Sequence, residues 1–266
     1  MTSGDLAGVV LAAGRGQRLR PLTDLRPKPL CPIANRAMLD LALERIAPFA
    51  GRGSQRIAVN AHYLAPMIAR HVGDRATVSV EQPAALGTAG ALGRLRTWLD
   101  GRPVLVTNAD AYLPGGLQSL VEGWDGVRIR LLGKETGRAS DFGTVRYVGA
   151  CLLPSWALSP LDDSPAGLYE RVWRQALAAD RLELVTTDGT AIDCGTPADY
   201  LAANLHASGG QSVVGAGAVV EGRIERCVVW PGAVVRAGEV LVSAVRAGTA
   251  LAPVTVRVAD PGTASA

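Results

Sequence analysis

Short apolar runs alternate in the first half of the chain with longer stretches in which apolar residues recur every three or four positions. The short runs are typical of buried strands, and the periodic stretches are typical of amphipathic helices. Strands are expected at residues 8–12, 56–60, 77–80, 104–107 and 127–131, and helices at 38–46, 64–72 and 88–99. This order predicts an α/β fold, a mostly parallel sheet with helices on both faces.

In an open, Rossmann-like sheet of this kind, ligands bind in the crevice beyond the carboxyl ends of the strands. Three loops that follow predicted strands lie there: residues 13–23, 82–88 and 108–110. They carry glycines, cations, an amide and a carboxylate, so the chemistry of the chain is expected in these loops.

The second half of the chain continues the pattern with shorter elements. Strands are expected at 142–145, 148–153, 182–185 and 191–192, and a helix at 169–179. A last helix should begin after Thr196, because threonine is a favoured N-cap and Pro197 suits the first helical position. It should end near His206.

Beyond residue 208, helix-forming residues give way to Val, Ala and Gly. Val228, Val234 and Val240 fall six positions apart, which is typical of a hexapeptide-repeat β-helix. The sequence thus predicts a main domain at 1–208 and a short, left-handed β-helix-like domain at 209–258, through which the chain forms a homo-oligomer. A small β-hairpin patch over a sheet edge is the alternative. Residues 259–266 are expected to be a disordered tail.

Composition narrows the class of protein. Of the 266 residues, 48% are hydrophobic and 19% charged, the balance of a folded globular chain. The net charge of +3 and the even scatter of arginines argue against nucleic acid as a partner. We find neither a signal peptide nor an apolar membrane span, so a cytoplasmic protein is expected. The four cysteines lack metal-site spacing and are expected to be buried.

The loop after the first strand has the composition of a phosphate-binding loop. Gly14 and Gly16 would let backbone N–H groups approach phosphate oxygens, and Arg18 and Lys28 would neutralise the charge. A dinucleotide-binding fingerprint would require a third glycine where Leu19 stands. A P-loop would require Gly-Lys-Ser/Thr, which the loop lacks.

These glycines belong to a longer motif, Leu11-Ala-Ala-Gly-Arg-Gly-Gln-Arg-Leu-Arg-Pro-Leu-Thr23, followed by Arg26-Pro-Lys-Pro-Leu30. Further segments are Glu81-Gln-Pro-Ala-Ala-Leu-Gly-Thr88, Val106-Thr-Asn-Ala-Asp110, Phe142-Gly143 and Ile192-Asp-Cys-Gly-Thr-Pro-Ala-Asp-Tyr200. Together, over residues 8–205, they resemble the nucleotide-sugar pyrophosphorylases, the sugar-1-phosphate nucleotidyltransferases.

The resemblance implies a Mg²⁺-dependent enzyme that joins a nucleoside triphosphate to a sugar-1-phosphate and releases pyrophosphate. It implies catalytic roles for Arg18 and Lys28, and metal ligation by Asp110 and Asp193. It implies sugar-phosphate binding at Gly143. The nucleotide-binding residues that it implies are Ala13, Gly14, Arg15, Gly16, Gln82, Gly87 and Thr88.

The residues leave a structural alternative open for several of these roles. Asp110 could cap a helix, Asp193 could occupy an ordinary turn, and Lys28 could be a solvated surface lysine. Against the last alternative, Lys28 lies between two prolines and is one of two lysines in the chain. Arg15 and Gln82 could simply be solvated.

One departure from the family concerns the acceptor. The family's Glu-Lys-Pro motif, whose lysine binds the sugar phosphate, is absent after Phe142-Gly143. The acceptor phosphate would then depend on Lys134, Arg138 or Arg146. Guanylyl transfer to mannose-1-phosphate and uridylyl transfer to a cell-wall sugar both remain open. A non-catalytic, nucleotide-sugar-sensing regulatory subunit of the same fold is the alternative function.

Overall fold

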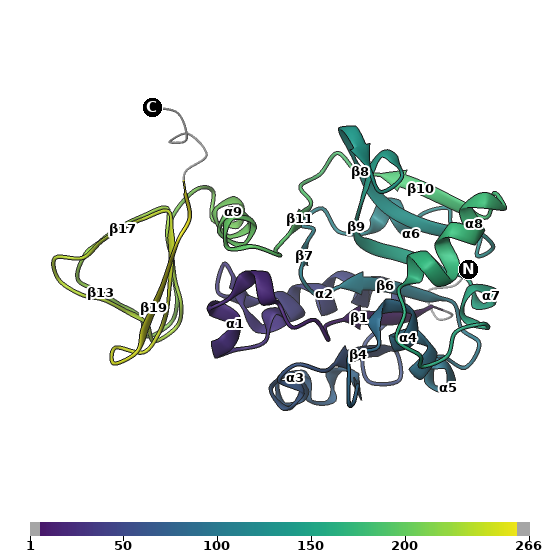
Figure 1. The fold of residues 1–266 in the computed structure, drawn as a ribbon, viewed down its shortest axis with the longest axis horizontal. Coiled ribbons are helices and arrows are strands. Elements are labelled where there is room, and N and C mark those ends of the chain that lie inside the picture. Colours follow the sequence, from purple (N-terminus) through teal and green to yellow (C-terminus); the bar gives the residue numbers. More distant parts are fainter. Residues whose placement is uncertain (1–5, 260–266) are drawn as a thin grey trace. The chain divides into compact units, whose positions relative to one another are not determined.

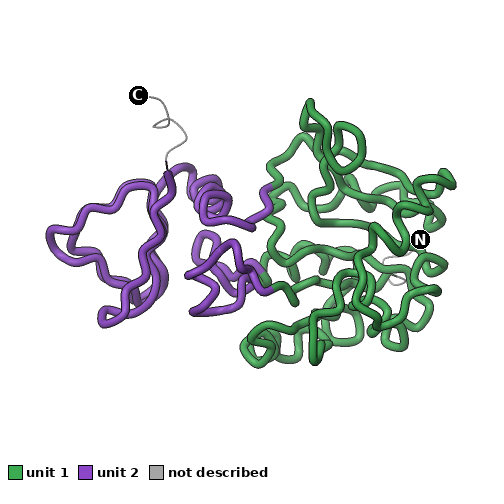
Figure 2. The backbone as a smooth tube through the Cα atoms, viewed as in Figure 1, with its two compact units in different colours: residues 1–14, 39–191 green, residues 15–38, 192–266 purple. Residues whose placement is uncertain are grey.

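The computed structural model describes residues 6–259, which form two compact units (Figure 2). Unit 1 contains residues 6–14 and 39–191, and unit 2 contains residues 15–38 and 192–259. Unit 2 therefore joins two pieces of chain that are far apart in sequence. The domain boundary at residue 208 stays a prediction. From residue 260 on, the tail expected at 259–266 lies outside the described residues.

Unit 1 is built on a seven-stranded sheet in the order β10-β8-β9-β6-β1-β4-β5 (Figure 1). Neighbours in the row β6-β1-β4-β5 are parallel, as are β10 and β8, whereas β9 is antiparallel to both β6 and β8. The mostly parallel sheet is confirmed. Its strands are β1 Ala7–Leu11, β4 Ile57–Ala61, β5 Thr77–Val80, β6 Val104–Asn108, β8 Ile129–Ser140, β9 Gly143–Leu153 and β10 Leu182–Thr186.

Helices cover both faces of this sheet. On one face, apolar residues of α4, α5 and α8 pack with alternate residues of the strands, such as Val9, Val106 and Leu131. On the other, α2 lies so close to β1 that a Cβ on Gly8 would stand 2.9 Å from Ile46 Cδ1. The helices of unit 1 are α2 Met38–Ala50, α3 Ala65–Val72, α4 Gly87–Arg94, α5 Arg96–Leu99, α6 Gln118–Val121, α7 Ser155–Leu158 and α8 Arg174–Ala178. Only the first residue of α2 belongs to unit 2. Unit 1 also contains the strand β7 Ala111–Tyr112 and a 3-10 turn at Gly73–Arg75.

Several predicted elements of unit 1 differ in the structure. The two strands expected at 142–145 and 148–153 are one strand, β9, whose register against β8 shifts around Gly149, which has φ +87°. The helix expected at 88–99 divides into α4 and α5. The helix expected at 169–179 begins as a π-helical turn, Tyr169–Trp173, before it continues as α8.

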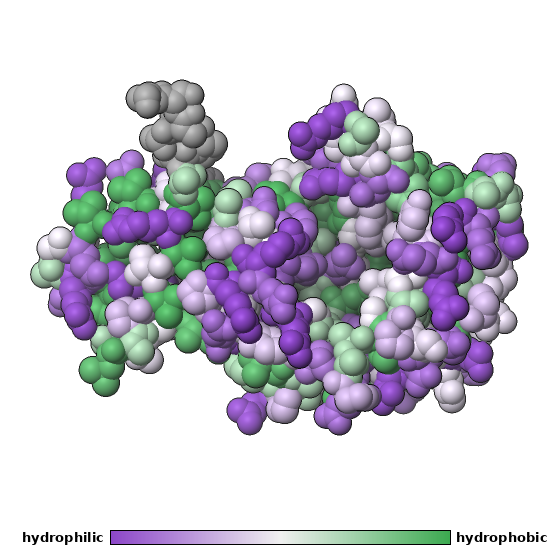
Figure 3. All heavy atoms as spheres, in the orientation of Figure 1, coloured by the Kyte–Doolittle hydropathy of each residue, from purple (hydrophilic) through white to green (hydrophobic). Residues whose placement is uncertain are grey.

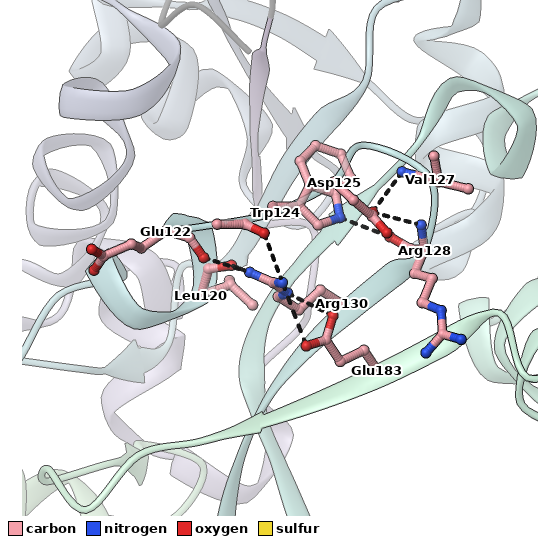
Figure 4. Close-up of polar contacts among 9 residues, drawn as sticks. Leu120, Glu122, Trp124, Asp125, Val127, Arg128, Arg130 and Glu183 are labelled. Carbon is pink, nitrogen blue, oxygen red and sulfur yellow. Dashed lines mark hydrogen bonds and ion pairs between the residues drawn. The ribbon is translucent and has the colours of Figure 1, made fainter.

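A buried arginine holds one side of unit 1 together (Figure 4). Arg130 Nε lies 3.0 Å from a carboxylate oxygen of Glu183, so the ion pair joins β8 to β10. The same guanidinium donates to the carbonyls of Leu120 and Glu122 at 3.2 and 2.8 Å. Because each of these polar groups has a partner, the chain that follows α6 is fixed to the sheet.

Unit 2 begins with a series of short turns. They are the 3-10 turns Gln17–Leu19 and Lys28–Leu30, the helix α1 Leu22–Leu25 and the small hairpin β2 Pro32–Ile33 and β3 Arg36–Ala37. Its second piece of chain opens with β11 Ile192–Asp193 and α9 Pro197–Ala207. The predicted N-cap is confirmed, since Thr196 Oγ1 accepts a hydrogen bond from the N–H of Asp199 at 3.2 Å.

The C-terminal strands form parallel pairs between successive turns of chain. Partners such as Val213 and Val228 are 15 residues apart, and Val228 and Val245 are 17 apart. Figure 1 shows these strands as the sides of a triangular coil, closed by the antiparallel pair of β18 and β19. The strands are β12 Val213–Val214, β13 Val219–Val220, β14 Arg223–Glu225, β15 Val228–Val229, β16 Val234–Val235, β17 Val240–Val242, β18 Ala244–Gly248 and β19 Pro253–Arg257.

Trp230 connects this coil to the rest of unit 2. Its indole N–H donates to the Tyr200 hydroxyl of α9 at 3.0 Å, and the Arg26 guanidinium lies 4.5 Å from its ring centroid. Trp230 and Tyr200 are almost completely buried. The C-terminal strands therefore support the segment that carries Lys28. None of the helices within residues 6–259 combines the length and the apolar character needed to cross a bilayer.

Candidate active site

The carboxyl ends of three parallel strands lie side by side in unit 1. Leu11, the last residue of β1, pairs with Asn60 of β4 on one side and with Asn108 of β6 on the other. The loops that follow these strands therefore leave the sheet along one edge, where sheets of this type bind ligands. The loops after β1 and β6, at 13–23 and 108–110, are two of the three in which the chemistry is expected.

Asp110 lies between β6 and β7 at this edge. The N–H of Ala109 donates to the carbonyl of Leu11 at 2.9 Å, which ties the Asp110 segment to the end of β1. The residue after Asp110 begins a strand, so Asp110 does not cap a helix. Its side chain is partly exposed, as a metal-binding carboxylate would have to be.

A buried arginine that the sequence did not single out braces this segment. From α2, Arg45 donates to the Thr107 hydroxyl at 2.9 Å, to the carbonyl of Asn108 at 3.1 Å and to that of Ala111 at 2.7 Å. These contacts lie on both sides of Asp110. Because Arg45 is 9% exposed, water cannot readily replace them. The arginine fixes the backbone that presents the carboxylate.

We expect Arg45→Met to lower the free energy of unfolding by about 3 kcal/mol, because the substitution leaves several buried acceptors without a donor. Urea denaturation measures the change. Arg70→Met, at an exposed position of α3, is the matched control and should shift stability by less than about 0.5 kcal/mol. Equal stability of the two variants would contradict the bracing role.

The loop between β5 and α4 carries the residues expected to bind the nucleotide base. Gln82 is exposed, in keeping with either ligand contact or solvation. Gly87 has φ +70°, and a Cβ there would stand 2.4 Å from the carbonyl oxygen of Ala166. The Thr88 hydroxyl accepts the N–H of Leu168 at 2.8 Å. The close packing of residues 162–168 on α4 thus accounts for a glycine at position 87 and a threonine at position 88.

Unit 2 brings together three of the predicted residues. Lys28 Nζ lies 3.7 Å from one carboxylate oxygen of Asp193, and Arg18 Nη2 lies 3.6 Å from the other. The Lys28 side chain is 8% exposed, against 70% for Arg18 and 57% for Asp193. Lys28 is therefore not a solvated surface lysine. Two cations around one accessible carboxylate leave a net positive charge, which suits an anionic ligand.

Two glycines make this cluster possible. Gly16 has φ +62°, and a Cβ there would stand 2.8 Å from Thr23 Cγ2 and 3.0 Å from Lys28 Cβ. A Cβ on Gly195 would stand 2.6 Å from Arg18 Nη2. By contrast, Gly14 has open space around its Cα. Gly16 and Gly195 let the loop close around the cations, while Gly14 leaves room on an exposed surface.

The remaining nearby groups are inert or exposed. Burial raises the pKa of the Cys31 thiol to about 12, although Arg26 and Lys28 act in the opposite direction, so Cys31 is not a nucleophile. All four cysteines are buried, as expected. Ala13 is buried at the start of the first loop, and Arg15 is exposed.

Two cations lie opposite each other on β8 and β9. Lys134 pairs with Arg146 in the antiparallel register; Lys134 donates to the carbonyl of Gly189 at 2.7 Å, and Arg146 to that of Ala191 at 3.3 Å. Like charges at paired positions repel unless something offsets them. Gly143 begins β9 with φ +67° and open space around it, so the hairpin turn alone accounts for a glycine there.

Within the part of the chain that the structure describes, no three carboxylate, imidazole or thiolate side chains gather into a metal-binding cluster. Magnesium usually binds through one or two carboxylates and the phosphates of a substrate, and it retains several waters. Each unit carries one accessible carboxylate near a strand end, Asp110 in unit 1 and Asp193 in unit 2.

Several known proteins are similar to this chain in sequence or in fold. The N-acetylmuramate α-1-phosphate uridylyltransferase of Caulobacter vibrioides is 28% identical over 76% of this chain and 97% of its own length. The mannose-1-phosphate guanylyltransferase catalytic subunit β of Dictyostelium discoideum is 26% identical over 74% of this chain and 63% of its own length. A Thermus thermophilus structure described as a mannose-1-phosphate geranyltransferase shares the fold, with a TM-score of 0.66, 20% identity and coverage of 95% of both chains. The family model for nucleotidyl transferases matches residues 7–149, and the chain belongs to the nucleotidyl transferase family.

Proposed function

We propose that this chain transfers a uridylyl group from UTP to N-acetylmuramate α-1-phosphate, producing the UDP-sugar and pyrophosphate. The observation that carries this choice of substrates is the Caulobacter uridylyltransferase, which this chain matches over 97% of that protein's length. Relatives that act on other sugar-1-phosphates share the same reaction class. The same relative therefore supports both the donor, UTP, and the acceptor, N-acetylmuramate α-1-phosphate.

The chemistry needs charge neutralisation more than a strong base. A phosphate monoester has its second pKa at about 6, so a sugar-1-phosphate is already an anionic nucleophile. The obstacle is its approach to an anionic triphosphate. We assign Lys28 as a fixed charge against the triphosphate and Arg18 as a contact of the departing pyrophosphate, because Lys28 is buried and Arg18 is exposed beside it.

The metal is proposed to be Mg²⁺. Asp110 and Asp193, each within its own unit, are proposed as its ligands, since both are accessible carboxylates at the ends of strands. Bound there, the ion would offset the charge of the phosphates. The Arg45 brace supports the role of Asp110, because it fixes the backbone that presents this carboxylate.

Nucleotide contacts are proposed for both loops. Ala13, Gly14, Arg15 and Gly16 would contact the phosphates, for which the open space around Gly14 is suited. Gln82 would contact the base, because an amide both donates and accepts. Gly87 and Thr88 would contact the nucleotide through the backbone of the same loop.

The acceptor phosphate is proposed to bind at Lys134 and Arg146. Their direct pairing on β8 and β9 concentrates positive charge that an anionic group would offset. Arg138 lies farther along the same hairpin and is exposed. Gly143 would then contribute backbone rather than side-chain contacts.

A substrate matrix tests the proposed pair. Pyrophosphate release is measured for UTP, GTP, CTP, ATP and dTTP against N-acetylmuramate, mannose and glucose 1-phosphates with Mg²⁺. UTP with N-acetylmuramate α-1-phosphate should give the highest kcat/KM. A higher value for GTP with mannose-1-phosphate would favour the second candidate, which rests on the Dictyostelium relative. If no pair of substrates released pyrophosphate, the result would favour the alternative function, a non-catalytic regulatory subunit.

We also propose that residues 209–258 form a short hexapeptide-type β-helix through which two cytoplasmic copies associate. Val219, Val240 and Val242 are 47%, 54% and 41% exposed, and Figure 3 shows hydrophobic side chains on the surface of these strands. Val240 and Val242 lie on the same strand, β17, and exposed apolar side chains close together are typical of an interface.

We expect Val240→Glu to shift sedimentation from a dimer to a monomer without loss of thermal stability, because the side chain is exposed and the added charge would be buried only in a dimer. A point variant is preferable to truncation at Gly209, which would also remove Trp230 from Tyr200 and Arg26. Identical sedimentation of variant and wild type would rule out this face as the interface.

A further inference from the structure

A buried chain of hydrogen bonds connects two of the loops at the ligand-binding edge of unit 1. The N–H of Ala12 donates to Asn60 Oδ1 at 2.6 Å, and Asn60 Nδ2 donates to Glu81 Oε1 at 2.7 Å. The other carboxylate oxygen of Glu81 accepts the N–H of Leu86 at 2.7 Å. The Asn60 and Glu81 side chains thus form a bridge from the end of β1 to the loop before α4.

Because the bridge is buried, each of its polar atoms needs a hydrogen-bond partner within the protein. Glu81 is 0% exposed and Asn60 is 3% exposed. A buried carboxylate requires partners for its oxygens, and a buried amide requires both an acceptor and a donor opposite it. In the bridge, donors and acceptors alternate at every contact. Any change that breaks this alternation leaves two like groups facing each other.

The backbone at Glu81 is fixed as well. Its N–H donates to the carbonyl of Ala61 at 2.8 Å, and its own carbonyl lies 3.0 Å from Nδ1 of His62. Asn60 lies within β4, paired with Leu11. The bridge therefore rests on the central strands of the sheet, and its two ends reach loops that are otherwise separate in sequence.

We propose that Asn60 and Glu81 are positioning residues that hold the phosphate loop, beginning at Ala13, and the base loop, Gln82 to Thr88, in one geometry for the nucleoside triphosphate. This inference rests on the proposed function, which assigns those loops to phosphates and base. A ligand that touches both loops benefits from their fixed spacing, whereas the acceptor sugar phosphate does not. Loss of the bridge should weaken triphosphate binding selectively.

The alternation of donors and acceptors provides an exchange experiment. In Glu81→Gln, an amide faces an amide and one N–H must meet another. In Asn60→Asp, two carboxylates face each other. In the double variant Asn60→Asp with Glu81→Gln, the introduced carboxylate accepts from Ala12 and from the introduced amide, whose oxygen accepts from Leu86. The double variant restores the alternation and the net charge, with polarity reversed.

We expect each single variant to raise the KM for UTP by about tenfold and to leave the KM for N-acetylmuramate α-1-phosphate within about twofold. The double variant should return the KM for UTP to within about threefold of wild type. The matched control is Glu183→Gln, the same acid-to-amide change at the buried Arg130 pair on β10 (Figure 4). It should lower thermal stability and leave both KM values unchanged, which separates positioning from general destabilisation.

Calorimetric UTP binding without acceptor keeps this inference distinct from the proposed function. Wild-type protein that binds UTP but releases no pyrophosphate would contradict the function and not the bridge. Folded single variants that bind UTP as tightly as wild type, or a double variant as weak as the singles, would overturn the bridge. If neither single variant folds, the double variant decides: folding with near-wild-type UTP affinity supports the proposal, and failure contradicts it.

Discussion

Lys28→Met should reduce kcat by about 100- to 1,000-fold, the loss typical when a preorganised charge at the reacting phosphates is removed. Methionine keeps most of the volume of the buried side chain, so the protein should stay folded. The lysine is 7% exposed and sits beside Asp193, where Gly16 allows it to approach. Steady-state pyrophosphate release measures the effect.

A control for this variant lies in the same segment. Arg20 is exposed and pairs with Asp24 at 3.0 Å on the surface. Arg20→Met also removes one positive charge, and it should change kcat by less than about twofold, since exposed ion pairs contribute little. Similar losses in both variants would mean that net charge matters rather than Lys28.

Asp110→Asn should reduce kcat by about 100-fold or more and raise the Mg²⁺ concentration for half-maximal activity. The amide keeps the shape but loses the negative charge on which a hard cation depends. Activity measured across a Mg²⁺ titration reports both quantities. An effect on kcat without any change in the Mg²⁺ requirement would assign Asp110 a role other than metal binding.

The matched control is Asp100→Asn in the same unit. Asp100 is exposed and has φ +50°, a conformation that asparagine tolerates well. The variant should fold and turn over like wild type, with an unchanged Mg²⁺ titration. If Asp110→Asn behaved like Asp100→Asn, the metal assignment of Asp110 would be wrong.

Periodicity located the strands of unit 1 because each buries one apolar run. The runs around Val9 and Val106 became β1 and β6, and the cap at Thr196 opened α9 as expected. Periodicity could not predict that β9 is one strand, because the strand continues through an irregular register near Gly149, where φ is +87°. Nor does it reveal that residues 15–38 pack with the C-terminal strands, a contact between Arg26 and Trp230 over a long stretch of chain.

The catalytic and metal-binding residues expected from the sequence are charged residues that lie within a recognisable motif. Lys28 was singled out by its flanking prolines, and the structure shows it buried. Arg45, Asn60 and Glu81 were not singled out. Asn60 follows Ile57, Ala58 and Val59 in an apolar run, and that placement of a polar residue is the one signal in the sequence. Its meaning depends on partners that only the fold brings within reach.

The fate of the phosphorus atoms of the triphosphate distinguishes nucleotidyl transfer to a sugar phosphate from hydrolysis. Wild-type protein is incubated with N-acetylmuramate α-1-phosphate, Mg²⁺ and UTP labelled at the α-phosphorus or at the γ-phosphorus. We expect the α-label to appear in the UDP-sugar and the γ-label in pyrophosphate, in equal amounts and only when both substrates are present. Release of labelled UMP without acceptor, or of orthophosphate from the γ-position, would contradict nucleotidyl transfer to a sugar phosphate.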